Sequence, residues 1–116
     1  MEDCLFCKFV NKKAPKTFVY ESDNVVAFKD IHPVAPVHIL IIPKKHITSI
    51  TEVTDDDKDL LGEIILTAKK IADKVGLSEN GYKLLFRVGR HGGQEVEHIH
   101  LHLIGGSMLT EDIHSI

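Results

Sequence analysis

The heptapeptide His98-Ile99-His100-Leu101-His102-Leu103-Ile104 alternates histidine and aliphatic side chains over its first six positions. Successive side chains of a β-strand point to opposite faces of a sheet. The segment is therefore predicted to be a strand with its histidines on one face and its aliphatic residues in the core. Thr, Lys or Glu would serve a solvated face equally well, whereas histidine supplies a neutral nucleophile and proton carrier near pH 7. The alternation thus predicts a chemical role for the histidine face.

A strand that carries histidines on one face also raises the question of a metal ion. Two histidines two positions apart can reach one Zn²⁺, but three in a row span about 13 Å at about 3.3 Å per residue. A simple three-histidine metal site is therefore not expected. Either all three histidines serve chemistry, or one of them ligates a metal while the other two act on a substrate.

The rest of the chain predicts an α+β fold. Five segments rich in β-branched and aromatic residues are expected to be strands, at 17–21, 24–29, 38–42, 82–88 and 98–104. A long helix is predicted to begin with Thr54 as its N-cap and to end at Gly76. A short helical segment is expected over 4–12. Because short connections favour antiparallel pairing, we expect a five-stranded antiparallel sheet with one long and one short helix.

Length and charge limit the classes of function. The chain has 116 residues and is expected to form a single domain over 1–116. Lys and Arg number 14 against 17 Asp and Glu, and the net charge of −3 excludes a strongly basic binder of nucleic-acid polymers. No apolar run approaches the roughly 20 residues of a membrane span, and no signal peptide is visible. We therefore expect a cytoplasmic protein that does not associate with membranes.

Four further blocks accompany the heptapeptide. They are Phe28-Lys29-Asp30-Ile31, Pro36-Val37-His38, Ile42-Pro43-Lys44-Lys45-His46-Ile47 and Gly92-Gly93-Gln94-Glu95-Val96. Together with the heptapeptide, these blocks resemble the histidine triad superfamily, in the order and spacing of its nucleotide-binding (HINT) branch. The resemblance covers nearly the whole chain and fades only in the C-terminal tail, 110–116.

The resemblance implies a nucleoside phosphoramidase or nucleotidyl hydrolase that forms homodimers. Such an enzyme cleaves at the α-phosphate of purine nucleoside monophosphate conjugates, of the AMP or GMP type, through a covalent nucleotidyl-histidine. By correspondence, His100 would be the nucleophile and His102 would bond the phosphate or the leaving group and assist proton transfer. His38 would orient His100 or bond the phosphate. A neutral imidazole suits this reaction, because an anionic phosphate repels anionic nucleophiles.

The resemblance also implies a set of nucleotide contacts. These are Phe6, Phe28 and Ile31 in an apolar slot for the base, Asp30 on the ribose hydroxyls, and Gly93, Gln94 and Val96 in a loop that presents backbone groups to the phosphate. The remaining histidines match no ligand or nucleophile role and are expected in loops: His32, His91 and His114.

Two positions depart from the pattern common in this branch. Arg87 stands where many members have an Asn that contacts the phosphate, so it either makes a stronger phosphate contact or pairs with a carboxylate. Glu95 stands where many have a Ser, and an ionised carboxylate accepts hydrogen bonds but donates none. The two departures keep a second function open, a nucleotide-binding or partner-docking module with little catalysis.

The only two cysteines, Cys4 and Cys7, form a C-x-x-C pair. A structural disulfide is not expected without a signal peptide, and the βαβ setting of a thioredoxin-like motif is missing. Two interpretations stay open, namely two small apolar residues on a helix or half of a Zn²⁺ site. In some histidine triad relatives such a pair joins two histidines, here His46 and His98, which would make a closed structural zinc site. A third function, a metalloprotein or metal-dependent hydrolase, follows from the same residues. No organic cofactor is expected.

Overall fold

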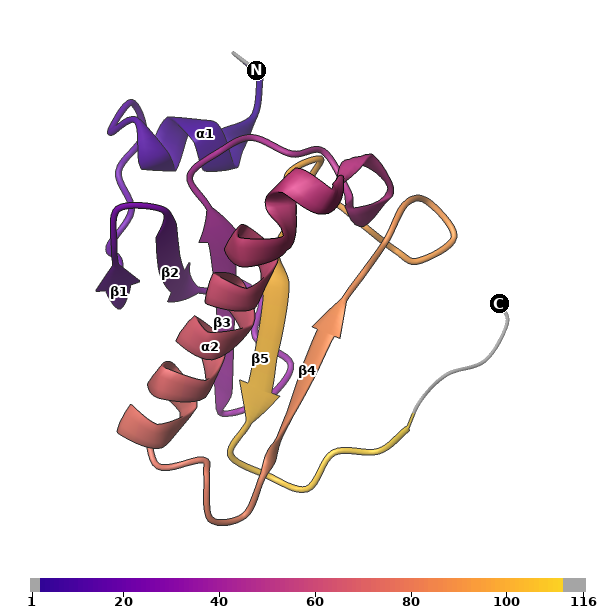
Figure 1. Ribbon diagram of the computed structural model, residues 1–116. Helices are drawn as coiled ribbons and strands as arrows, with labels where there is room; N and C mark the ends of the chain where they lie inside the picture. Colours follow the sequence, from indigo (N-terminus) through magenta and orange to yellow (C-terminus); the bar gives the residue numbers. More distant parts are fainter. Residues whose placement is uncertain (1–2, 112–116) are drawn as a thin grey trace.

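The structure is a computed structural model that describes residues 3–111 (Figure 1). One antiparallel sheet has the strand order β1-β2-β3-β5-β4. Its strands are β1 (Tyr20–Glu21), β2 (Val25–Lys29), β3 (Val37–Pro43), β4 (Tyr82–Phe86) and β5 (Leu101–Gly105). The α-helices are α1 (Leu5–Val10) and α2 (Lys58–Lys74), and two 3₁₀ turns precede α2, η1 (Ile50–Glu52) and η2 (Asp55–Asp57). The predicted α+β class, with five antiparallel strands, one long helix and one short helix, is confirmed.

The long helix α2 covers one face of the sheet (Figure 1). Ile64, Ala68 and Ile71 recur at helical spacing and are buried in one cluster with Leu101 and Leu103 of β5. Burying an aliphatic side chain of this size contributes about 1.5–3 kcal/mol. The aliphatic residues of the heptapeptide thus enter the core, as predicted.

The short helix α1 packs on the opposite face of the sheet. Phe6 is buried there with Val26 and Phe28 of β2 and with Leu40 and Ile42 of β3. Because both faces of β2 and β3 are covered, these strands are nearly continuous hydrophobic runs rather than alternating ones. This second core holds α1 beside the histidine face of β5.

The start of the long helix follows the predicted N-cap but begins with a 3₁₀ turn. The Thr54 hydroxyl accepts a hydrogen bond from the backbone N–H of Asp56, and the Asp57 carboxylate accepts one from the N–H of Thr54. This reciprocal pair is a capping box. Lys45 Nζ lies 2.9 Å from the same carboxylate. The α-helix proper begins after this turn, at Lys58.

The heptapeptide is a strand over only part of its length, and the prediction of a strand from His98 was wrong at that end. The ladder between β3 and β5 ends at the pair Ile41–Leu101, and the same register would set Ile99 opposite Pro43, which has no N–H to continue it. The N–H of Ile99 instead donates to the carbonyl of Ile47. The alternation of faces survives, since all three histidines lie on the α1 face, with exposures of only 0%, 7% and 7%.

Two other strands are shorter than the sequence predicted. The strand expected over 17–21 shortens to β1, and the strand expected over 82–88 ends at Phe86. Across residues 3–111, none of the helices has the length and apolar character to cross a membrane.

Candidate active site

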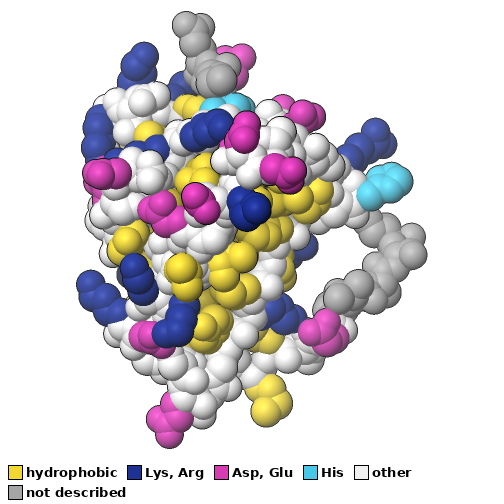
Figure 2. Space-filling view, viewed as in Figure 1, with side chains coloured by type: hydrophobic (Ala, Val, Ile, Leu, Met, Phe, Trp, Pro, Cys, Tyr) yellow, Lys and Arg dark blue, Asp and Glu magenta, His cyan; other side chains and the backbone are white. Residues whose placement is uncertain are grey.

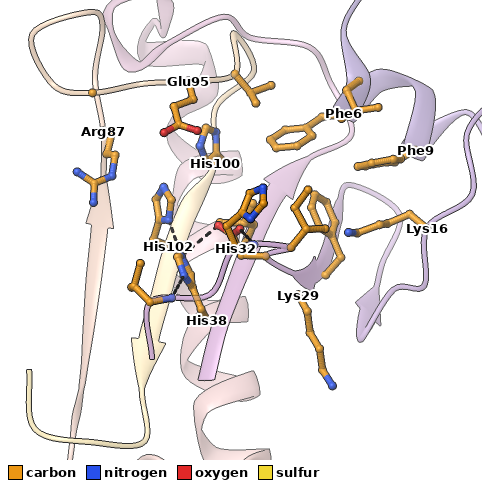
Figure 3. A pocket seen from close by; sticks show the side chains of 18 residues that line it. Phe6, Phe9, Lys16, Lys29, His32, His38, Arg87, Glu95, His100 and His102 are labelled. Carbon is orange, nitrogen blue, oxygen red and sulfur yellow. Dashed lines mark hydrogen bonds and ion pairs between the residues drawn. The ribbon is translucent and has the colours of Figure 1, made fainter. Parts of the chain in front are cut away.

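A cavity of about 480 Å³ opens on the α1 face of the sheet (Figure 3). This volume lies within the range of small-molecule sites. One end of the cavity is polar and is lined by His38, His100, His102, Arg87 and Glu95. The other end is aromatic and is lined by Phe6, Phe9 and Phe28, with Asp30 and Ile31 also in the wall. Of the predicted nucleotide contacts, all but Gln94 therefore line one cavity.

His38 and His102 form a hydrogen-bonded pair whose proton positions follow from their partners. The backbone N–H of Val34 donates to His38 Nδ1 at 3.2 Å, so the His38 proton resides on Nε2. That Nε2 lies 2.9 Å from His102 Nδ1 and 3.4 Å from a carboxylate oxygen of Asp30. His102 Nδ1 then accepts, and its proton resides on Nε2. This buried Nε2 has no hydrogen-bond partner within residues 3–111, so it is a spare donor at the polar end of the cavity.

His100 is oriented by the backbone rather than by His38. Its Nδ1 lies 2.8 Å from the carbonyl oxygen of His98, so Nδ1 carries the proton and Nε2 keeps a free lone pair. The ring of Phe6 packs edge-on against the imidazole, with centroids 5.3 Å apart. His100 is thus held as a neutral imidazole with an unprotonated Nε2. The expected partnership of His38 with His100 is replaced by the pairing of His38 with His102.

Burial keeps His38, His100 and His102 uncharged. It lowers the pKa of His102 from 6.5 to about 4, helped by the neighbouring His100 and His38. Burial also lowers the pKa of His38, against the attraction of the Asp30 carboxylate. It lowers the pKa of His100 in the same way, against the hydrogen bond to His98 and the charges of Asp30 and Glu95. At pH 7 the site therefore contains neutral imidazoles.

The two residues that depart from the branch pattern both face the cavity. Figure 3 shows the Glu95 carboxylate beside His100 and the Arg87 side chain at the polar end. Of the carboxylates in residues 3–111, none forms an ion pair with Arg87. A guanidinium left without a carboxylate at this end of the cavity is suited to an anion.

Comparison with known proteins assigns the family. The family model described as scavenger mRNA decapping enzyme C-terminal binding matches residues 3–114. The purine nucleoside phosphoramidase of Escherichia coli strain K12 is 46% identical over 108 residues, which cover 93% of this chain and 91% of that protein. A HIT family hydrolase from Legionella pneumophila Philadelphia 1 aligns with a TM-score of 0.93 and 55% identity, over 95% of this chain and 98% of that one. This chain belongs to the histidine triad superfamily.

A second solved histidine triad protein, from Clostridium difficile, aligns with a TM-score of 0.92 and 42% identity over 96% of each chain. The shared fold extends over the sheet and both helices, so the cavity is built on the scaffold of the superfamily. The Escherichia coli relative is a phosphoramidase, and the Legionella pneumophila relative is a hydrolase of this superfamily.

The glycine-rich loop of this histidine triad protein is held by Gln94. The Gln94 side chain accepts from the N–H of Gly89 and donates to the carbonyls of Thr48 and Val96, so it braces the loop and does not line the cavity. A Cβ at Gly92 would collide with the backbone of Val88. Gly92 therefore closes the loop on itself, and other residues of the loop, including Glu95, face the cavity.

Several lining residues were not found from the sequence. They are Leu5, Phe9, Lys16, Lys29, His32, Val34 and Leu40. Phe9 lies one helical turn after Phe6, a spacing that indicates a shared face of α1. His32, predicted as a loop residue, lies in the wall next to Asp30, which accepts a hydrogen bond from its N–H. His114 and residues 112–116 of the tail lie outside the described residues.

The four residues predicted as zinc ligands converge next to the cavity. One ligand atom each from Cys4, Cys7, His46 and His98 lies within 4.8 Å of the others. His98 Nδ1 lies 3.4 Å from Cys4 Sγ and 3.6 Å from Cys7 Sγ, and His46 Nδ1 lies 3.2 Å from Cys7 Sγ. Zn–S bonds of about 2.3 Å and Zn–N bonds of about 2.0 Å place sulfur and nitrogen about 3.5 Å apart around a tetrahedral ion. The donor set and its spacing therefore fit zinc.

The orientation of His98 supports the same conclusion. Its Nε2 donates to the carbonyl of Pro43 at 2.8 Å, which leaves the Nδ1 lone pair directed at the thiols. Burial lowers the pKa of His98 to about 4, so the ring is a neutral ligand. A hydrogen bond from the far nitrogen to a carbonyl is the usual support for a metal-binding histidine.

A second group, Asp30, His38 and His102, is also close enough to surround an ion. Its hydrogen bonds argue against one. Because Val34 donates to His38 Nδ1, the nitrogen that faces Asp30 and His102 carries a proton. An ion there would have to remove this proton from a neutral imidazole, so we interpret the group as a hydrogen-bond network.

Proposed function

We propose that this protein is a nucleoside phosphoramidase or nucleotidyl hydrolase that cleaves at the α-phosphate of purine nucleoside monophosphate conjugates, with His100 as a covalent nucleophile. The proposal rests on His100 at the polar end of a nucleotide-sized cavity. Its Nδ1 is hydrogen-bonded to the carbonyl of His98, which leaves the lone pair of Nε2 free to attack. The names of the Escherichia coli and Legionella pneumophila relatives support the reaction class.

The order of side chains along the cavity matches the parts of a nucleoside monophosphate. The flat base suits the aromatic end with Phe6, Phe28 and Ile31. The Asp30 carboxylate lines the cavity 3.4 Å from His38 Nε2 and is an acceptor for ribose hydroxyls. The anionic phosphate then reaches the polar end, where the loop of Gly93 and Val96 and the guanidinium of Arg87 line the wall.

The proposed reaction has two displacements at phosphorus. The lone pair of His100 Nε2 forms a bond to the α-phosphorus while the bond from phosphorus to the leaving amine breaks, and the amine takes up a proton from solvent. Water then attacks the same phosphorus and releases a proton to solvent, the bond to His100 breaks, and the nucleoside monophosphate leaves. The Nε2–H of His102 donates to the phosphoryl oxygens or the leaving group throughout. A covalent intermediate on a neutral imidazole divides the hydrolysis into two steps, each with a lower barrier than direct attack of water on the substrate.

The alternative, a nucleotide-binding module with little catalysis, is favoured by one feature. Glu95 places an acceptor-only carboxylate beside the nucleophile, where a Ser in many relatives of this branch would donate to the leaving group. Tight binding of AMP or GMP without turnover of any phosphoramidate or dinucleotide would establish this alternative.

Turnover and its pH dependence test the proposal. The purified protein is expected to release the amine from fluorogenic adenosine and guanosine phosphoramidates at pH 7. After subtraction of uncatalysed hydrolysis, kcat/KM should stay flat from pH 8 to 6 and fall as the pH approaches 4. His102 must be neutral to accept from His38, and its folded pKa of about 4 lies below the ordinary 6.5. The charged and titratable groups facing it are Asp30, His38, Arg87 and His100. Half-loss of activity near pH 6.5 would contradict a buried, neutral pair.

We also propose that the cluster of Cys4, Cys7, His46 and His98 holds a structural zinc ion. Four protein ligands leave no position for substrate, so the ion would tie α1 to the segments around β3 and β5. The cysteines flank Phe6, so the zinc site would also position a wall of the base slot.

We further propose that the protein forms a homodimer through β4 and α2. β4 is an edge strand with β5 as its one neighbour in the described sheet. Beside it, α2 exposes 47% of Ile65 and 58% of Leu66, and Leu84 of β4 is also exposed on this face. Figure 2 shows hydrophobic side chains gathered along α2 in the centre of the view. A second copy would cover this surface and extend the sheet.

The dimer is tested by changing its apolar surface. Leu66→Glu is expected to convert a particle of about 26 kDa, twice the 13.0 kDa chain, into a monomer in sedimentation velocity. Burying a carboxylate in such an interface costs its desolvation and disfavours association. Val34→Glu, which changes an exposed hydrophobic residue on the α1 face of the sheet, is the matched control and should remain dimeric. A wild-type monomer at micromolar concentration would contradict the proposal.

A further inference from the structure

We propose that Lys16 donates hydrogen bonds to the edge of the purine base and gives the enzyme a preference for guanine nucleotides over adenine nucleotides. The inference rests on the proposed function, because it takes the aromatic end of the cavity as the base slot. Lys16 belongs to the segment between α1 and β1, outside every block that indicated the family.

The Lys16 ammonium lies over the aromatic end instead of extending into solvent. Its Nζ is 5.0 Å from the ring centroid of Phe28 and 5.4 Å from that of Phe9. These two rings meet edge to face with centroids 5.4 Å apart. Figure 3 shows the Lys16 side chain at the same end of the cavity as Phe6 and Phe9. Attraction between a cation and aromatic faces at such distances holds the side chain in place. Of the carboxylates in residues 3–111, none pairs with Lys16.

The other side chains at this end cannot tell one purine from another by hydrogen bonding. Phe6, Phe9, Phe28 and Ile31 are hydrocarbon, and every purine presents an apolar face to them. The hydrogen-bonding histidines and Arg87 lie at the opposite end, with Glu95 (Figure 3). The remaining polar side chains of the lining are His32, which lies beside Asp30, and Lys29, whose side chain extends away from the rings in Figure 3. Of the charged groups that line the described cavity, Lys16 is the one over the rings, so we assign the discrimination between bases to it.

An ammonium has three donors and no acceptor. Guanine presents two neighbouring acceptors, O6 and N7, whereas adenine presents the acceptor N7 beside the donor amino group at C6. Lys16 can donate to both guanine atoms. With adenine, one of these two acceptors is replaced by the C6 amino group, which is itself a donor and cannot accept from the ammonium. Hypoxanthine carries the same O6 and N7 as guanine and lacks only the amino group at C2. Guanosine and inosine conjugates should thus be equivalent to Lys16.

The test compares guanosine, inosine and adenosine phosphoramidates that share one amine. For the wild type, kcat/KM for guanosine and inosine is expected to exceed that for adenosine by about tenfold, near the lower end of the discrimination of a good base contact. Lys16→Met keeps the aliphatic stem and should bring the three values within about twofold of one another, through KM rather than kcat. Lys13→Met, an exposed lysine of the same segment that does not line the cavity, should keep the wild-type ratio.

The outcomes separate this inference from the proposed function. Turnover with equal rates for all three bases, or an unchanged ratio in Lys16→Met, overturns the role of Lys16 and leaves the hydrolase intact. A preference for guanosine over both inosine and adenosine also overturns it, because that pattern requires contact with the C2 amino group. If none of the three is turned over, the hydrolase proposal fails, and dissociation constants of GMP, IMP and AMP for the two lysine variants and the wild type decide the role of Lys16 by the same ratios.

Discussion

Replacing His100 by Asn is expected to lower kcat for a nucleoside phosphoramidate by at least about 10³-fold. Asn keeps a donor that can reach the carbonyl of His98, so the local backbone contact is preserved. It has no nitrogen lone pair to form a bond to phosphorus, so the covalent route is lost. Nucleotide binding should persist, because the base slot and Arg87 are unchanged.

Mass spectrometry of the intact protein measures the intermediate directly. Rapidly quenched wild-type protein should carry one nucleoside monophosphate adduct, and the His100→Asn variant should carry none while it still binds GMP or AMP. His91→Asn is the matched control, since His91 is an exposed loop histidine that does not line the cavity. Undiminished turnover in His100→Asn would eliminate His100 as the nucleophile, and equal losses in both variants would indicate a general effect on folding.

The heptapeptide predicted the two faces of β5 correctly but not the length of the strand. The alternation of side chains is local and can be read from one segment. The extent of pairing depends on where the partner strand stops, and that limit is set by Pro43, far away in the sequence.

The hydrogen-bond partner of His38 also could not be predicted from the sequence. In the antiparallel register, His38 lies opposite Ile104, which makes His102 its diagonal neighbour on the same face. Only this register, together with the Val34 N–H that fixes the His38 proton, identifies the pair. Lys16 escaped detection for a related reason, because nothing in its local sequence indicates that it lies over rings of α1 and β2. The zinc cluster, in contrast, was named in full from the resemblance, and the four donor atoms do converge.

Loss of the zinc ligands is expected to destabilise the protein strongly. The double variant Cys4→Ser, Cys7→Ser should contain almost no zinc and should unfold about 15 °C below the wild type. An ion present at about 1,000 times its dissociation constant contributes about 4 kcal/mol, and each kcal/mol moves the midpoint by roughly 4 °C in a domain of this size. A six-residue helix has little stability of its own, so α1 depends on its anchors.

The double variant separates the metal from the capping role of Cys4. The Sγ of Cys4 accepts from the N–H of Cys7 at the start of α1, and Ser is a better N-cap than most residues, so the cap is retained. Elemental analysis should find one zinc per wild-type chain, and a strong chelator should lower the wild-type midpoint to that of the variant. Because α1 carries Phe6, both treatments should also weaken GMP and AMP binding. The zinc proposal would be wrong if the wild-type protein contained no zinc after expression with added zinc, or if chelation left its unfolding midpoint unchanged. Cys4 and Cys7 would then be two small apolar residues of a helix.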